Sequence, residues 1–154
     1  MKTKNNSENQ TSTAIAKADT IKLGVDVHAN TIVVVRIVDG GAPQPPQRFT
    51  GRQFLIWAEK QLQLACKVFS CYEAGPFGYS LHRELEKRGL TNLVIRPRDW
   101  DEYGQKVKTD QRDARQLALA LDRFVRGNHD ALCVVRCLHR KKNNDAVAPG
   151  SGRR

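Results

Sequence analysis

The order of the periodic segments along the chain constrains its fold more than any other feature of the sequence. Apolar and polar residues alternate over residues 21–28, and β-branched residues dominate residues 31–38, which is typical of half-buried strands. The short link His28-Ala29-Asn30 fits a hairpin turn between them. Residues 47–50 predict a third, short strand. The chain is therefore expected to begin with a meander of three strands.

Helices and strands then alternate. The pair Thr50-x-x-Gln53 is a capping-box signature, which predicts that a helix begins there. The later segments predict a strand over residues 67–72, a helix over 78–87 that stops at Gly89, a strand over 93–95 and a helix over 110–126. A meander followed by this alternation predicts an α/β fold, with a mixed five-stranded sheet flanked by helices. Such sheets place their reactive groups at strand ends and in the adjoining loops.

Polar segments flank this region and carry much of the formal net charge of +10. Residues 1–20 and 128–154 show no sustained strand or helix period, so we expect two disordered tails around one folded domain at residues 21–127. The last 24 residues contain six basic residues and a single acidic one, Asp145. A positive balance of this size favours a polyanionic partner, with nucleic acid as the first candidate.

No segment predicts membrane insertion or export. Apolar runs such as residues 32–35 are far shorter than the roughly 20 residues that cross a bilayer, and the N-terminus lacks the apolar region of a signal peptide. We therefore expect reduced thiols at the four cysteines, Cys66, Cys71, Cys133 and Cys137. An alternative interpretation is a zinc half-site made by Cys133, Cys137 and His139, although a C-x2-C spacing and a second ligand pair are missing.

Two carboxylates stand near the expected ends of strands. Asp26 lies in the otherwise apolar strand at residues 21–28, where an acid is costly to bury and needs a partner or a ligand. Glu73 follows the strand at residues 67–72, directly before the Gly-Pro break. If these strands are parallel neighbours, Asp26 and Glu73 lie close together. Glu73 alone could also be an ordinary surface charge.

The helix expected over residues 110–126 carries two more acids. Counted from Asp110, its apolar stripe includes Asp113, so both aspartates head the face that the helix turns to the core. Two carboxylates would then point towards the sheet from the start of the helix. Each has a simpler interpretation as well, Asp110 as the N-cap and Asp113 as a first-turn acid favoured by the helix dipole.

Four acids from two strand ends and a helix start fit hard divalent cations such as Mg²⁺ or Mn²⁺. Two such ions about 4 Å apart can hold the attacking and leaving oxygens of a phosphodiester displacement. The pattern therefore predicts metal-dependent cutting or strand transfer on nucleic acid. His28 faces the same side as Asp26, and it is either a turn residue or an assistant of the site. The nearby Lys106, Lys108, Arg112 and Arg115 either contact phosphates or form a solvated basic face.

Three motifs resemble a known group of enzymes. The segments GVDVHA at residues 24–29, CYEAGPFGY at 71–79 and KTDQRDARQLA at 108–118 are similar to the insertion-sequence transposases of the DEDD class. This group is the IS-one-ten family, which is related to the Piv/MooV DNA invertases. The motifs occur in the order of the family, and the resemblance covers about residues 20–130.

The resemblance implies an RNase H-like fold, similar to that of the RuvC Holliday-junction nuclease. It assigns the four metal-binding acids of the family to Asp26, Glu73, Asp110 and Asp113. It further implies Mg²⁺-dependent recombination of transposon-end and target DNA in the bacterial cytoplasm, at the nucleoid. Some members of the family use a structured guide (bridge) RNA, and homo-oligomers are expected.

The sequence departs from the family beyond about residue 136. Family members continue into a coiled coil and a C-terminal transposase domain with a serine nucleophile, whereas this chain ends in a basic segment. We therefore expect a truncated fragment that keeps the fold and the metal site but is inactive alone.

Two other functions are compatible with the same residues. The first is a stand-alone RuvC-like junction nuclease. The second is a transposon remnant that binds DNA through basic side chains without catalysis, with an affinity that falls steeply with salt. Sugar kinases and actin-like ATPases also begin with a Gly-x-Asp strand, but here Val27-His28-Ala29 replaces the required phosphate loop.

Overall fold

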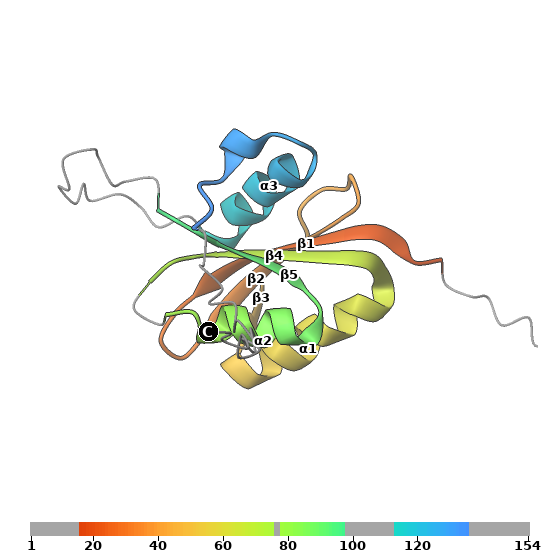
Figure 1. Cartoon of the computed structure of the whole chain (residues 1–154). Helices are drawn as coiled ribbons and strands as arrows, with labels where there is room; N and C mark the ends of the chain where they lie inside the picture. Colours follow the sequence, from red (N-terminus) through yellow and green to blue (C-terminus); the bar gives the residue numbers. More distant parts are fainter. Residues whose placement is uncertain (1–15, 76–77, 98–112, 136–154) are drawn as a thin grey trace, which may run out of the picture.

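The computed structural model describes residues 16–75, 78–97 and 113–135 of the 154-residue chain. These residues form five strands, three helices and a short 3-10 turn (Figure 1). In chain order the elements are β1 (Ala18–Val27), β2 (Ile32–Val38), β3 (Gln47–Phe49), α1 (Gly51–Leu64), β4 (Ala65–Glu73), α2 (Ser80–Arg88), β5 (Thr91–Ile95), α3 (Ala114–Val125) and η1 (His129–Ala131).

The strands form one mixed sheet in the order β3-β2-β1-β4-β5. β1, β2 and β3 pair antiparallel, as a meander does, whereas β4 runs parallel to both β1 and β5. The predicted α/β fold with a mixed five-stranded sheet is therefore confirmed. Sheet and helices together are consistent with an RNase H-like fold.

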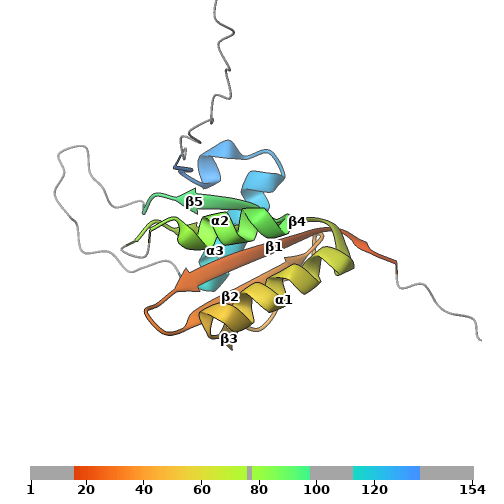
Figure 2. The ribbon, with the colours of Figure 1, turned by 60° about the horizontal axis from the view of Figure 1, so that its bottom comes forward.

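Helices cover both faces of the sheet. α1 and α2 lie on one face, and α3 lies on the other (Figures 1 and 2). The face towards α1 and α2 holds the larger apolar core, in which Leu23, Val25 and Phe54 are fully buried. The face towards α3 holds Cys71, Val35 and the inward residues of the helix, such as Leu117 and Leu121. Alternate residues of the strands therefore point into two separate apolar cores, one on each face of the sheet.

The folded region is longer at both ends than the predicted domain at residues 21–127. β1 begins at Ala18, within the segment that we expected to be disordered. After α3, Leu132 is buried at 4% exposure, and the backbone amide of Val135 donates to the carbonyl of Val94 in β5 over 2.8 Å. The prediction of a tail from residue 128 is thus wrong for residues 128–135. Residues 1–15 and 136–154 lie outside the described segments.

Two predicted helix ends are confirmed, and one predicted helix start is wrong. The capping box of Thr50 and Gln53 is present at the start of α1, and Gly89 ends α2 with a φ of 104°. The prediction that the third helix begins at Asp110 is wrong, because Asp113 is extended and α3 begins at Ala114. Residues 110–112 lie outside the described part of the chain.

α3 is held against β1 at two points. Gly24 lies directly beneath the helix backbone, since a Cβ atom there would overlap the Ala114 carbonyl oxygen and the Ala118 amide nitrogen. Further back along β1, the buried Lys22 ammonium lies 2.9 Å from the Asp122 carboxylate of α3. From its start over Gly24, α3 therefore runs back along β1 towards Lys22.

Two further sequence expectations concern the membrane and the cysteines. No helix of the described residues is long and apolar enough to span a membrane. Within the described residues Cys66, Cys71 and Cys133 form no disulfide bond. Cys137 and His139 of the zinc half-site lie outside the described residues.

Candidate active site

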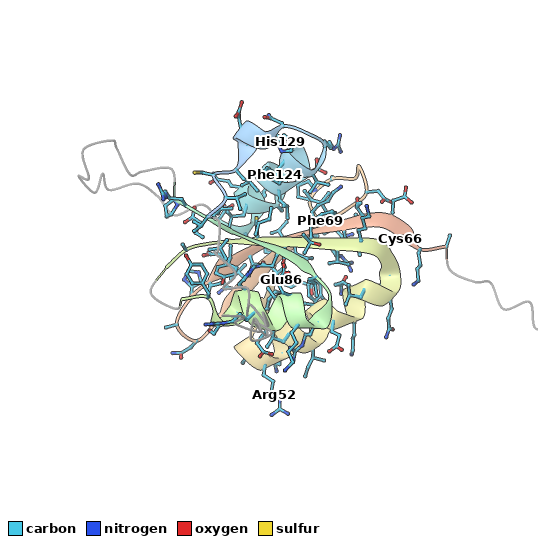
Figure 3. The ribbon with its side chains drawn as sticks, viewed as in Figure 1. Arg52, Cys66, Phe69, Glu86, Phe124 and His129 are labelled. Carbon is cyan, nitrogen blue, oxygen red and sulfur yellow. The ribbon has the colours of Figure 1, made fainter. Side chains whose placement is uncertain are left out.

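Asp26 lies near the end of β1, on the face of the sheet that carries α3. Its neighbours Leu23 and Val25 point into the core beneath α1 and α2, so the alternation of the strand turns Lys22, Gly24 and Asp26 to the other side. Figure 3 shows this layer, in which Phe69 of β4 and Phe124 of α3 belong to the same apolar cluster. Asp26 itself is close to the edge of that layer, and its side chain is 20% exposed.

Glu73 is the last residue of β4, and it lies on the same face as Asp26. Cys71, two residues earlier, turns to α3, where its Sγ lies 3.6 Å from the carbonyl oxygen of Leu117. β1 and β4 are parallel, and Gly24 is paired with Cys71. The paired register ends there, and Asp26 and Glu73 each lie two residues beyond this last pair, on the same face of the sheet. The expected parallel pairing of the two strands is confirmed, while the closeness of the two carboxylates stays a prediction.

The described part of α3 begins near Gly24 rather than at the end of β1. The helix begins over Gly24, and Asp26 lies two residues closer to the end of β1. The strand ends that carry Asp26 and Glu73 therefore extend past the start of α3. These two carboxylates therefore stand at the end of the sheet that lies next to the N-terminus of α3, on the face that carries this helix.

Asp113 reaches the same end of the sheet, but not in the predicted orientation. Its Oδ1 accepts a hydrogen bond from the Gln116 amide over 2.9 Å, so Asp113 is the N-cap of α3, and its side chain is exposed. The prediction that Asp113 heads the core-facing stripe is wrong, because the helix has not begun at this residue. Asp113 instead has the N-capping role that was one of the two interpretations of Asp110.

His28 contacts the Asp26 carboxylate directly. Its Nε2 lies 2.9 Å from Asp26 Oδ2, and half of the His28 side chain is exposed. Because an ionised carboxylate only accepts hydrogen bonds, the Nε2 nitrogen carries the proton in this contact. His28 thus contacts Asp26 and is also a turn residue, since its backbone amide donates to the Thr31 carbonyl over 2.9 Å.

The remaining predicted site residues are only partly within the described segments. Asp110, Lys106, Lys108 and Arg112 lie outside them. Arg115 is exposed in the first turn of α3, next to the capping residue Asp113.

Within residues 16–75, 78–97 and 113–135, no three His, Cys, Asp or Glu side chains are grouped closely enough to hold a metal ion. The contacts of two candidates are consistent with this result. The Asp113 carboxylate is used as a helix cap, and that of Asp26 is paired with His28. The structure thus brings Asp26, Glu73 and the start of α3 to one end of one face without assembling a closed ligand set.

Replacement of Asp113 separates its capping role from its charge. Asp113→Ala should lower the free energy of unfolding by about 1 kcal/mol, because the Gln116 amide loses its acceptor. Asp113→Asn should change it by only a few tenths of a kcal/mol, since asparagine caps a helix about as well. Urea unfolding measures both values. Equal losses for the two variants would contradict the cap and point to the charge instead.

Sequence reasoning missed two residues that position this site. Gly24 sets how closely α3 approaches the sheet, and Lys22 anchors the other end of the helix. The sequence does contain a sign of the role of Lys22. Lys22 points to the same face of an apolar strand as Asp26, and a lysine buried there also needs a partner. The requirement for glycine at residue 24 depends on the docked helix, and the sequence carries no local sign of it.

Comparison with known proteins gives a consistent result. No protein-family model matches the chain. The transposase for insertion sequence element IS1533 of Leptospira borgpetersenii is 29% identical over 107 residues, which cover 64% of this chain and 30% of that protein. The protein named "Putative transposase y4qE" of Sinorhizobium fredii is 44% identical over 55 residues, which cover 35% of this chain and 14% of that protein. The chain therefore spans less than a third of the length of these relatives, and it is similar to transposases, one of them that of an insertion sequence.

Proposed function

We propose that this chain is a DEDD-type catalytic domain of an insertion-sequence transposase, which cuts and joins DNA with the help of divalent metal ions. The observation that carries the proposal is that Asp26 and Glu73 stand near the ends of two parallel neighbouring strands, on the face of the sheet that carries α3. The similarity to transposases supports it independently. DNA is the proposed partner, while a guide RNA and a homo-oligomeric assembly follow from the family resemblance alone.

The donor chemistry of these residues fits Mg²⁺ or Mn²⁺. Carboxylate oxygens are hard ligands, and two acids on neighbouring strands repel each other unless a cation compensates them. Asp26 and Glu73 would hold the metal from the sheet, and Asp110 and Asp113 from the segment before α3. When bound, a pair of such ions stabilises the charge on the attacking and leaving oxygens of the phosphodiester.

The other side chains near this end have supporting roles in the proposal. His28 orients the Asp26 carboxylate through the 2.9 Å contact, much as an outer-shell partner fixes a metal ligand. Arg115 is exposed in the first turn of α3, where its guanidinium can contact a phosphate on either side of the cut. Lys106, Lys108 and Arg112 would extend this basic surface.

Metal titration of the full chain tests the site. Calorimetry with Mn²⁺ should detect binding to the wild-type chain, and Asp26→Asn should weaken that binding at least about tenfold, because it removes a charged ligand without changing its shape. Asp113→Asn should weaken binding as well while leaving the stability intact. The matched control is Asp130→Asn, which removes an exposed acid from η1, beyond the far end of α3.

Two results would count against the metal site. The first is the absence of Mn²⁺ binding by the wild-type chain. The second is equal binding by wild-type protein and Asp26→Asn. Where binding is present, nicking of branched and transposon-end DNA in Mn²⁺ distinguishes a nuclease that acts alone from a domain that needs further parts of a transposase.

One observation favours a second candidate, a DNA-binding transposon remnant without catalysis. The described residues contain no group of three potential ligands, as an assembled metal site would require. This candidate predicts DNA binding that falls steeply with salt and is the same with and without Mn²⁺. The Mn²⁺ titration therefore separates the two functions.

A further inference from the structure

A hollow lies between β3 and α1, away from the candidate active site. Its volume is about 430 Å³, and its lining comes from the edge strand of the sheet and from one stripe of the helix. The lining residues are Arg48, Phe49, Gln53, Ile56, Trp57 and Lys60. α1 covers the face of the sheet opposite to α3, as Figure 2 shows, so this hollow and the Asp26 carboxylate lie on different faces.

Aromatic and aliphatic side chains form the apolar part of this hollow. The rings of Phe49 and Trp57 lie 5.1 Å apart at an angle of 35°. Beside them Ile56 is 49% exposed, so it adds aliphatic surface to these rings. A solvent-facing apolar surface next to polar groups is typical of an interaction site.

The indole ring of Trp57 is held in place by Arg36 of β2. The Arg36 guanidinium lies 5.8 Å from the centre of the ring, and Arg36 itself donates to Gln44 and Gln61 over 2.7 Å each. This cation–π contact holds the ring in place, and Trp57 is at the same time one of the residues that line the hollow. A rigid aromatic surface loses little conformational entropy when a flat ligand stacks on it.

The charged groups of the hollow are all basic. Arg48 and Lys60 are exposed at its rim, and neither takes part in the ion pairs found among the described residues. The acid on the same stretch of α1, Glu59, turns instead towards α2, where it lies 3.7 Å from Arg88. Two cations beside fixed aromatic rings therefore face solvent with no acid in the lining.

We propose that this hollow binds a single-stranded nucleic acid. Unpaired bases would stack on the Phe49–Trp57–Ile56 surface, while Arg48 and Lys60 would contact the flanking phosphates. Aromatic stacking combined with a cationic rim is how proteins hold single strands without reading their sequence. A duplex does not satisfy this surface, because its bases are stacked on one another. The inference does not depend on the proposed catalysis, and a strand bound here would leave the face of Asp26 accessible.

Binding of labelled 12-nucleotide oligo-dT and oligo-rU to the full chain, followed by fluorescence anisotropy, tests the cationic rim. Arg48→Gln/Lys60→Gln should weaken binding about tenfold and reduce the slope of log affinity against log salt by about 1.4, since each single-strand phosphate contact contributes about 0.7. The control Arg83→Gln/Lys87→Gln removes two exposed charges from α2 and should change both values much less. Equal losses for the two double variants would overturn the proposal, because binding would then depend on net charge alone.

Tryptophan fluorescence tests the stacking. The chain has two tryptophans, so the Trp100→Phe variant confines the signal to Trp57. Saturating oligonucleotide should quench this emission, and the arm that quenches at the lower concentration identifies DNA or RNA as the preferred strand. Unchanged Trp57 emission with both bound oligonucleotides, or preference for a duplex of the same length, would refute the single-strand site.

Discussion

Replacement of Gly24 by valine should detach α3 from the sheet and destabilise the fold by about 3 kcal/mol or more. A Cβ at this residue would lie 2.8 Å from Ala118 Cα and would overlap the Ala114 carbonyl oxygen and the Ala118 amide nitrogen. These atoms belong to the helix backbone, so no side chain can move aside to make room. Gly24 has no positive φ, and the close approach of the helix is therefore the reason for glycine here.

The loss would extend well beyond one contact. Leu117, Leu121 and Cys71 are fully buried between α3 and the sheet, and they would lose part of that burial if the helix moved outwards. The start of α3 would also move away from Asp26, so Mn²⁺ binding should fall together with stability. Asp26→Asn should lower Mn²⁺ binding alone, which distinguishes damage to the scaffold from damage to the ligand set.

Urea unfolding of Gly24→Ala and Gly24→Val measures the effect, and Gly51→Ala is the matched control. A Cβ on Gly51 meets no atom within 4 Å, and this residue begins α1. Gly51→Ala should leave the stability unchanged or raise it slightly, since it lowers the entropy of the unfolded chain. If Gly24→Val unfolds at the same urea concentration as the wild-type chain, the tight packing of α3 on β1 is wrong.

Local signals in the sequence were sufficient for most of the fold. The alternation in β1 predicted which of its residues enter the core, and the Thr50–Gln53 capping box and Gly89 predicted two helix ends. The start of α3 was predicted wrongly, because residues that precede the N-cap can also be counted at helical spacing. Such a count does not show at which residue the helix begins. Residues 128–135 were taken for a tail because their order depends on long-range contacts, such as the pairing of Val135 with Val94.

The candidate site was predictable where it depends on topology alone. Parallel pairing of β1 and β4 is enough to bring Asp26 and Glu73 to the same end of the same face of the sheet. The cap made by Asp113 and the packing of Gly24, in contrast, depend on where α3 begins and how it docks. No spacing rule within one segment contains that information.

The second large effect is expected at the buried ion pair between β1 and α3. Lys22 is 3% exposed, and its ammonium lies 2.9 Å from Asp122 Oδ1 and donates to the Asp39 carbonyl over 2.6 Å. Asp39 also accepts the Thr20 amide through its own carboxylate. One ammonium group therefore joins β1, α3 and the turn after β2, which makes it a main determinant of how α3 lies on the sheet.

Asp122→Ala should cost about 3–5 kcal/mol of unfolding free energy, because a buried ammonium loses its counter-charge. The double variant Lys22→Met/Asp122→Leu should recover most of this loss, since an apolar pair of similar size needs no desolvation of charge. Arg126→Ala is the control. Arg126 lies 3.1 Å from the same Asp122 carboxylate, but it is 57% exposed, and loss of such a surface pair costs less than about 1 kcal/mol.

A double-mutant cycle in urea measures the coupling between Lys22 and Asp122. Strong coupling together with recovery in the double variant would identify the pair as a device that fixes α3 over Gly24 rather than as a net source of stability. This distinction matters for the candidate site, because the same helix brings Asp113 to the end of β1. A cost of Asp122→Ala as small as that of Arg126→Ala would show that Lys22 finds water or another acceptor. α3 would then be anchored by its apolar face and by Gly24 alone.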